Sequence, residues 1–82
     1  MKPGISSYLL HRVNVTMKDS RQIEGTMLSV DTDMNVVLED SEEFRCIKKQ
    51  PEQQRRTLGL VVLRGEFIVD VQIISKPAIQ NT

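Results

Sequence analysis

One stretch of the sequence decides the fold: Leu58-Gly59-Leu60-Val61-Val62-Leu63-Arg64-Gly65-Glu66-Phe67-Ile68-Val69-Asp70-Val71-Gln72-Ile73-Ile74. Its first part, 58–63, is apolar apart from one glycine, which is typical of a strand buried on both faces. Its second part alternates, placing Phe67, Val69, Val71 and Ile73 on one side, and this predicts a strand with one buried face. The polar residues 64–66 indicate a turn, so the stretch predicts a hairpin.

A chain of this size cannot bury both faces of the apolar run 58–63 in its own core. A chain of 82 residues has room for one core, and a small domain buries only about 60–65% of its unfolded surface. An uncovered apolar edge strand aggregates unless another chain pairs with it. We therefore predict oligomerisation through this strand. The alternative is that a short terminal helix covers its outer face.

Composition narrows the class of protein. Eleven basic and eleven acidic residues cancel, which argues against coating nucleic acid by long-range attraction but permits local recognition by a few side chains. The only cysteine, Cys46, has no internal disulfide partner, which fits a reducing compartment. With a single histidine, His11, we expect no metal site and no cofactor. We also expect an intracellular protein without a membrane span, because no apolar stretch approaches about 20 residues.

The remaining pattern predicts a single all-β domain over residues 1–82. A short helix is expected at about 5–11, after Pro3 and Gly4, and strands at about 13–17, 22–30 and from 34 onward. Gly25 lies inside the second strand and indicates a sharp bend of the kind that curls a small sheet into a barrel. An exposed basic loop is expected at 48–56.

Two motifs in this order resemble the Sm/LSm family. Asp31-x-x-Met34-Asn35-Val36-Val37-Leu38 is similar to the end of the first Sm motif, which would span about 12–44, and Leu60-Val61-Val62-Leu63-Arg64-Gly65-Glu66 is similar to the second, about 57–74. Gly25 lies where the family keeps a glycine, and residues 43–48 and 58–66 most resemble the spliceosomal members. The resemblance implies the Sm fold, a five-stranded, strongly bent SH3-like barrel with a short N-terminal helix.

The resemblance also implies a ring, usually of seven subunits, in which the fourth strand of one subunit pairs with the fifth of the next. The interface residues it implies are Leu58, Leu60, Val61, Val62, Leu63, Ile68, Val69 and Val71. We expect a hetero-heptamer of Sm-fold subunits around uridine-rich small nuclear RNA in the core of spliceosomal particles, located in the nucleus after cytoplasmic assembly. The alternatives are an LSm-type ring in RNA decay or RNA chaperoning, and an SH3-like adaptor that binds protein partners without RNA.

The resemblance places RNA contacts at Asp33, Asn35, Arg64 and Gly65. The Asn35 amide can match the carbonyl and imide N–H of uracil, the Arg64 guanidinium can stack on a base, and Gly65 lets the backbone approach closely. We expect Asp31 to orient Asn35 or Arg64 from behind.

Asp33 departs from the family pattern, since many members carry a stacking His or aromatic residue there. The structural alternatives are that Asn35 is only a turn residue and Arg64-Gly65 only a hairpin connection. The sequence contains no Ser/His/Asp grouping, so we expect no enzyme.

Overall fold

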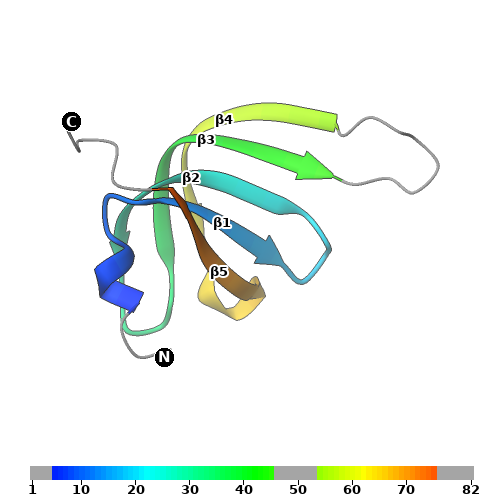
Figure 1. Ribbon diagram of the computed structural model, residues 1–82. Helices are drawn as coiled ribbons and strands as arrows, with labels where there is room; N and C mark the ends of the chain where they lie inside the picture. The colour runs from blue at the N-terminus through cyan, green and yellow to red at the C-terminus, as the bar shows by residue number, and fades with distance from the viewer. Residues whose placement is uncertain (1–4, 46–53, 76–82) are drawn as a thin grey trace, which may run out of the picture.

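The computed structural model describes residues 5–45 and 54–75, which form one strongly curved antiparallel sheet (Figure 1). The elements in chain order are the 3-10 turn η1 (Ile5–Tyr8), β1 (Arg12–Met17), β2 (Gln22–Val30), β3 (Val36–Arg45), β4 (Gln54–Leu63), the 3-10 turn η2 (Gly65–Phe67) and β5 (Ile68–Ser75). The predicted five-stranded, strongly bent all-β fold is therefore confirmed. Of the basic loop expected at 48–56, residues 48–53 lie outside the described residues, while residues 54–56 belong to β4.

The strand order across the sheet is β4-β3-β2-β1-β5, so β4 and β5 are its two edges. The predicted hairpin between them is wrong, because β5 pairs with β1 and not with β4. The backbone N–H of Lys18, in the β1–β2 turn, donates to the Phe67 carbonyl at 2.8 Å. This bond fixes η2 against the β1 side of the sheet and directs β5 away from β4. Figure 1 shows η2 as the short link between the two edges.

The sharp bend expected at Gly25 coincides with an irregularity in the β2–β3 pairing. Glu24 pairs with Glu42 but Thr26 pairs with Glu39, so the register shifts at the glycine. A Cβ atom on Gly25 would lie 2.9 Å from the Cβ of Ser41, closer than real Cβ atoms approach. The two bent strands therefore cross too closely at this position for any side chain on β2.

One face of the curved sheet forms the core. The period-two prediction for β1 is confirmed, since its alternate residues are all buried. Burying a Val, Ile, Leu or Met side chain contributes roughly 1.5–3 kcal/mol each, so this cluster is the main source of stability. Its members are Val13, Val15, Met17, Ile23, Met27, Val36, Leu38, Leu63 and Val71.

The predicted alternation of β5 holds only at its centre. Val71 is 2% exposed, but Val69 on the same nominal face is 61% exposed. The β1–β5 register shifts between Thr16 and Met17, which leaves Val69 without a direct partner. The core therefore covers Val71 in the middle of this edge strand and part of Ile68 at its start, but not Val69 between them.

The N-terminal helical segment is shorter than predicted. Instead of a helix over about 5–11 there is the single 3-10 turn η1, after which Leu10 adopts a positive φ of 66°. The Leu10 N–H then donates to the Met27 carbonyl at 2.7 Å, and the Met27 N–H donates to the His11 carbonyl at 3.1 Å. The chain after η1 therefore bonds to the backbone of β2 and does not continue as a helix. No helix in the described part of the chain is long and apolar enough to cross a membrane.

Candidate nucleic-acid interface

The β2–β3 turn, residues 31–35, is built around the carboxylate of Asp31. Its Oδ1 accepts hydrogen bonds from the backbone N–H groups of Asp33 and Asn35, both at 2.9 Å. Its Oδ2 accepts from the Asn35 side-chain amide at 3.0 Å. An Asp side chain that bonds its own turn in this way replaces the missing ladder bonds of the backbone. Asp31 therefore holds Asn35 directly.

Asn35 joins this turn to the end of β4. Its Oδ1 accepts a hydrogen bond of 2.8 Å from the backbone N–H of Gly65, thirty positions later in the chain. Because Nδ2 faces the Asp31 carboxylate and Oδ1 faces an N–H, the orientation of the amide is determined by its partners. The structural alternative that Asn35 is only a local turn residue does not hold. The same side chain holds two distant segments together.

Gly65 is required here because the two turns are in contact. A Cβ atom at Gly65 would lie 1.9 Å from the carbonyl oxygen of Asp33 and 2.9 Å from the Cβ of Met34. No rotamer change removes a clash with backbone atoms. The Arg64-Gly65 pair is therefore more than a connection, since it places Arg64 beside the β2–β3 turn.

The hydrogen bonds around Asp31 also affect its titration. The backbone N–H of Asn35, and next its side-chain amide, lower the pKa of the Asp31 carboxyl below its ordinary value of 3.8. Donors that bond the charged form favour it, and here they outweigh the small effect of desolvation. Asp31 is therefore a carboxylate at neutral pH, as its acceptor role requires.

Arg64 projects into solvent at the rim of a shallow hollow of about 440 Å³. Its guanidinium lies 3.8 Å from the Glu66 carboxylate, and both side chains are about two-thirds exposed, so this pair contributes little stability. The Arg64 fork therefore stays available for a ligand. The residues that line the hollow are Asp33, Met34, Asn35, Arg64, Gly65 and Glu66.

The sequence-predicted contact residues thus gather around one hollow, with Asp31 behind them. Asp33 is exposed at its edge, so its negative charge faces solvent beside Arg64. Sequence reasoning missed Met34 and Glu66 as lining residues. Glu66 directly follows Arg64-Gly65 and could have been found from that position alone. Met34 has a positive φ of 64°, for which its residue type gives no signal.

The edge strands form the second part of the candidate site. Leu60 and Val62 on β4 are 67% and 63% exposed, and Val69 on β5 is 61% exposed. Two of the expected interface residues are corrected: the side chains of Leu63 and Val71 point into the core and are buried. Three more pack partly against that core, namely Leu58, Val61 and Ile68. The apolar surface open to a neighbouring chain is therefore narrower than the sequence pattern indicated.

Fold and site together define a class: small, strongly bent β-barrels with two open strand edges and a hollow formed by two joined turns. The chain belongs to the LSM-domain family, because the sequence model of the LSM domain matches residues 3–73.

Two similar proteins indicate which branch of this family the chain resembles. Small nuclear ribonucleoprotein-associated protein B of Schizosaccharomyces pombe is 48% identical over 77 residues, covering 87% of this chain and 52% of that protein. The protein of the same name in Dictyostelium discoideum is 41% identical over 73 residues, covering 85% and 27%. The chain thus spans about half the length of these relatives, or less. The expected similarity to spliceosomal Sm proteins is confirmed, and in both organisms it is to the B type.

A third relative has a different role. N-alpha-acetyltransferase 38, NatC auxiliary subunit, of Xenopus tropicalis is 34% identical over 70 residues, covering 84% of this chain and 62% of that protein.

Solved structures agree on the architecture. A heptameric archaeal Sm protein superposes with a TM-score of 0.70 over 89% of this chain and 98% of its own, at 29% identity. A chain in the crystal structure of the NatC complex bound to CoA superposes with a TM-score of 0.72 over 90% and 86%, at 23% identity. At that identity the second likeness concerns the fold alone.

Proposed function

We propose that this chain is an Sm-ring subunit that pairs edge to edge with neighbouring Sm proteins and helps hold single-stranded, uridine-rich RNA. The observation that carries the proposal is the Asn35–Gly65 hydrogen bond of 2.8 Å, because it joins the two turns and brings a recognition amide and an exposed guanidinium to one hollow. Two open strand edges with exposed apolar residues support the ring. The role is binding and assembly, without catalysis.

The remaining valences of Asn35 suit a uracil edge. A side-chain amide has two N–H donors and two acceptor lone pairs. Asp31 and Gly65 use one of each, which leaves one N–H and one lone pair for a ligand. Uracil offers a carbonyl beside an imide N–H, which is the complementary pattern. Arg64 would stack on the base or pair with its phosphate.

The names of the relatives supply the cellular setting of the proposal. Two B-type relatives are named as associated with small nuclear ribonucleoproteins, and the archaeal Sm protein is heptameric. We place this chain by analogy in a mixed seven-membered ring in the core of a spliceosomal particle, acting in pre-mRNA splicing in the nucleus after assembly in the cytoplasm.

A titration of labelled uridine oligomer against the assembled ring tests the proposal. Arg64→Ala should weaken binding by about tenfold at fixed salt, or ~1.4 kcal/mol, because a cation over an aromatic ring contributes about 0.5–2 kcal/mol. The matched control is Arg55→Ala near the start of β4, which removes the same charge away from the hollow that Arg64 lines and should bind like wild type. Equal binding by wild-type, Arg64→Ala and Arg55→Ala rings would refute the RNA-reading role.

A second candidate, an adaptor that binds protein and no RNA, is favoured by two observations. Asp33 puts a carboxylate at the rim of the hollow, where it repels phosphate and cannot stack on a base. A relative at 34% identity is named as an auxiliary subunit of the acetyltransferase NatC. The wild-type titration separates the two, since an adaptor ring or complex would not bind the uridine oligomer at all.

A further inference from the structure

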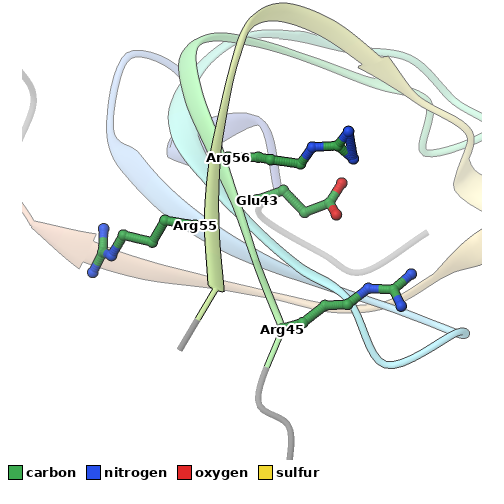
Figure 2. A pocket seen from close by; sticks show the side chains of 4 residues that line it. All are labelled: Glu43, Arg45, Arg55 and Arg56. Carbon is green, nitrogen blue, oxygen red and sulfur yellow. The ribbon is translucent and has the colours of Figure 1, made fainter. Parts of the chain in front are cut away.

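A second hollow lies at the far end of β3 and β4, away from the two joined turns. It has a volume of about 580 Å³ and is lined by Glu43, Arg45, Arg55 and Arg56. Figure 2 shows Glu43, Arg45 and Arg56 pointing to the same side of the two strands, while Arg55 points to the other. β3 has ten residues, so its two ends are separated by a contour of about 30 Å. The proposed uridine site does not use this hollow.

The sheet register explains why these charges share a face. Glu43 pairs with Ile23 on β2 and with Arg56 on β4, and directly paired residues lie on the same side of an antiparallel sheet. Ile23 is in the core, so Glu43, Arg45 and Arg56 continue the inner face of the sheet beyond the core. The residues that extend the inner face of a sheet beyond its core are ordinarily apolar. Here they are the charged residues Glu43, Arg45 and Arg56.

The positive charges on this face exceed the negative charge. Glu43, whose side chain is 9% exposed, is neutralised by Arg21 at 3.2 Å. The side chains of Arg45 and Arg56 make no hydrogen bond or ion pair with any residue that the structure describes. Asp19 lies within electrostatic reach of Arg45: the pKa of its carboxyl is lowered chiefly by the backbone N–H of Arg21 and, as the smallest contribution, by the charge of Arg45. Arg55, on the outer face, is fully engaged: its guanidinium lies 2.6 Å from Glu42 and 4.4 Å from the centre of the Phe44 ring. Two guanidinium groups without a bonded partner among the described residues therefore border a single concave surface.

We propose that Arg45 and Arg56 hold a phosphodiester group of the RNA strand outside its uridine segment. The inference rests on the proposed function. Guanidinium forks match the oxygens of a phosphate in pairs, which an ammonium cannot do. The only aromatic side chain among the neighbouring described residues, Phe44, is covered by Arg55, so this face offers no stacking surface for a base. The site therefore recognises the charge of the RNA backbone and does not distinguish one base sequence from another.

The test compares two RNAs on the assembled ring: a short uridine oligomer, and the same oligomer extended at both ends by unrelated single strand. The double variant Arg45→Gln/Arg56→Gln should bind the extended RNA about fivefold more weakly at fixed salt. Its plot of log affinity against log salt should also be shallower by about 0.7, the slope of one phosphate contact on a single strand. The short oligomer should bind as to wild type.

Two further variants complete the design. Lys18→Gln removes a positive charge from an exposed position of the β1–β2 turn, which does not line this hollow, and should leave both affinities unchanged. Arg45→Lys/Arg56→Lys keeps the charge without the fork, so the salt slope should return to that of wild type while the affinity recovers only in part.

The possible outcomes separate this inference from the function on which it rests. If the double glutamine variant binds extended RNA like wild type, the phosphate site is wrong while the uridine site stands. If that variant instead fails to assemble with its neighbours, the hollow docks an acidic protein segment, which also overturns the inference. A wild-type ring that binds neither RNA overturns the proposed function and this inference together.

Discussion

At the scale of single residues, the Asn35 amide has two roles that cannot be separated by one substitution. It accepts the Gly65 N–H and donates to Asp31, so Asn35→Ala would disconnect the two turns as well as remove a candidate base contact. A loss of RNA binding by that variant therefore says little about recognition. Arg64 and Asp33, which are exposed at the same hollow, are better probes.

Asp33→His should tighten binding of the uridine oligomer by about tenfold, or ~1.4 kcal/mol per altered subunit. The change removes a negative charge near phosphates and adds a ring that stacks on a base, an interaction worth roughly 1–3 kcal/mol. The measurement is a titration of the assembled ring at fixed salt, with Asp33→Asn separating the effect of charge from that of stacking. An affinity that neither variant changes would place this turn away from the RNA.

Asp31 gives the turn a defined dependence on pH. Its folded-state pKa lies below the ordinary value of 3.8, so its carboxylate stabilises the turn above about pH 4, and this stabilisation is lost as the pH falls through the lowered pKa. The NMR signals of the Asn35 side-chain amide should therefore shift in acid before the core unfolds. Asp31→Asn should move them at neutral pH already. Amide signals unchanged down to global unfolding would contradict this.

The sequence could predict which residues meet at the hollow, because two motifs named them, but not how they meet. The Asn35–Gly65 bond joins positions thirty residues apart, and no local pattern reports such a contact. Met34 shows a related limit. Its positive φ follows from the hydrogen bonds that close the turn around Asp31, and a methionine gives no indication of it.

At the scale of single elements, the bend in β2 depends on a missing side chain. Gly25→Val should lower the free energy of unfolding by about 1–3 kcal/mol, the usual cost of forcing atoms into a packed site. The reason is that a Cβ there would lie 2.9 Å from the Cβ of Ser41 and 3.1 Å from the Glu39 carbonyl oxygen. Thermal or urea unfolding measures the effect.

The control for Gly25→Val is Thr57→Val, which introduces the same residue at an exposed position of β4. It should leave stability within about 0.5 kcal/mol of wild type. Equal unfolding curves for Gly25→Val and the control would show that β2 can bend without the glycine.

Alternation in the sequence predicted the strands better than it predicted their partners. In β1 the pattern was sufficient, because strands lie on both of its sides and its inner face is wholly covered. In β5 the same pattern misled, because an edge strand is covered only where the sheet curls over it, which leaves Val69 exposed and Val71 buried. The periodicity of a sequence indicates which residues of one strand share a face. It does not indicate the order of the strands, which depends on distant contacts such as the hydrogen bond between Lys18 and Phe67.

At the scale of the whole molecule, the two open edges predict assembly. Val62→Lys should prevent ring formation and leave the fold of the subunit intact, because the Val62 side chain is 63% exposed. Val61→Lys should instead lower the free energy of unfolding by about 1–3 kcal/mol, because Val61 packs against the core. Native mass spectrometry reports assembly, and circular dichroism reports the fold. A Val62→Lys protein that still forms rings would show that β4 does not mediate the contact.

The strand order also constrains how the chain folds. The first four strands are neighbours in both sequence and space, so each can pair with the next one in the chain. β5 has to close a loop back to β1, for example Val71 to Val15, across most of the chain. Loop-closure entropy makes such a contact slow to form, and it is repaid only when Val71 enters a core that the earlier strands have begun to build. We therefore expect β5 to dock last in folding. The chain acquires the edge that β5 provides only when folding is complete, so unfinished subunits lack one of the two surfaces by which a ring could incorporate them.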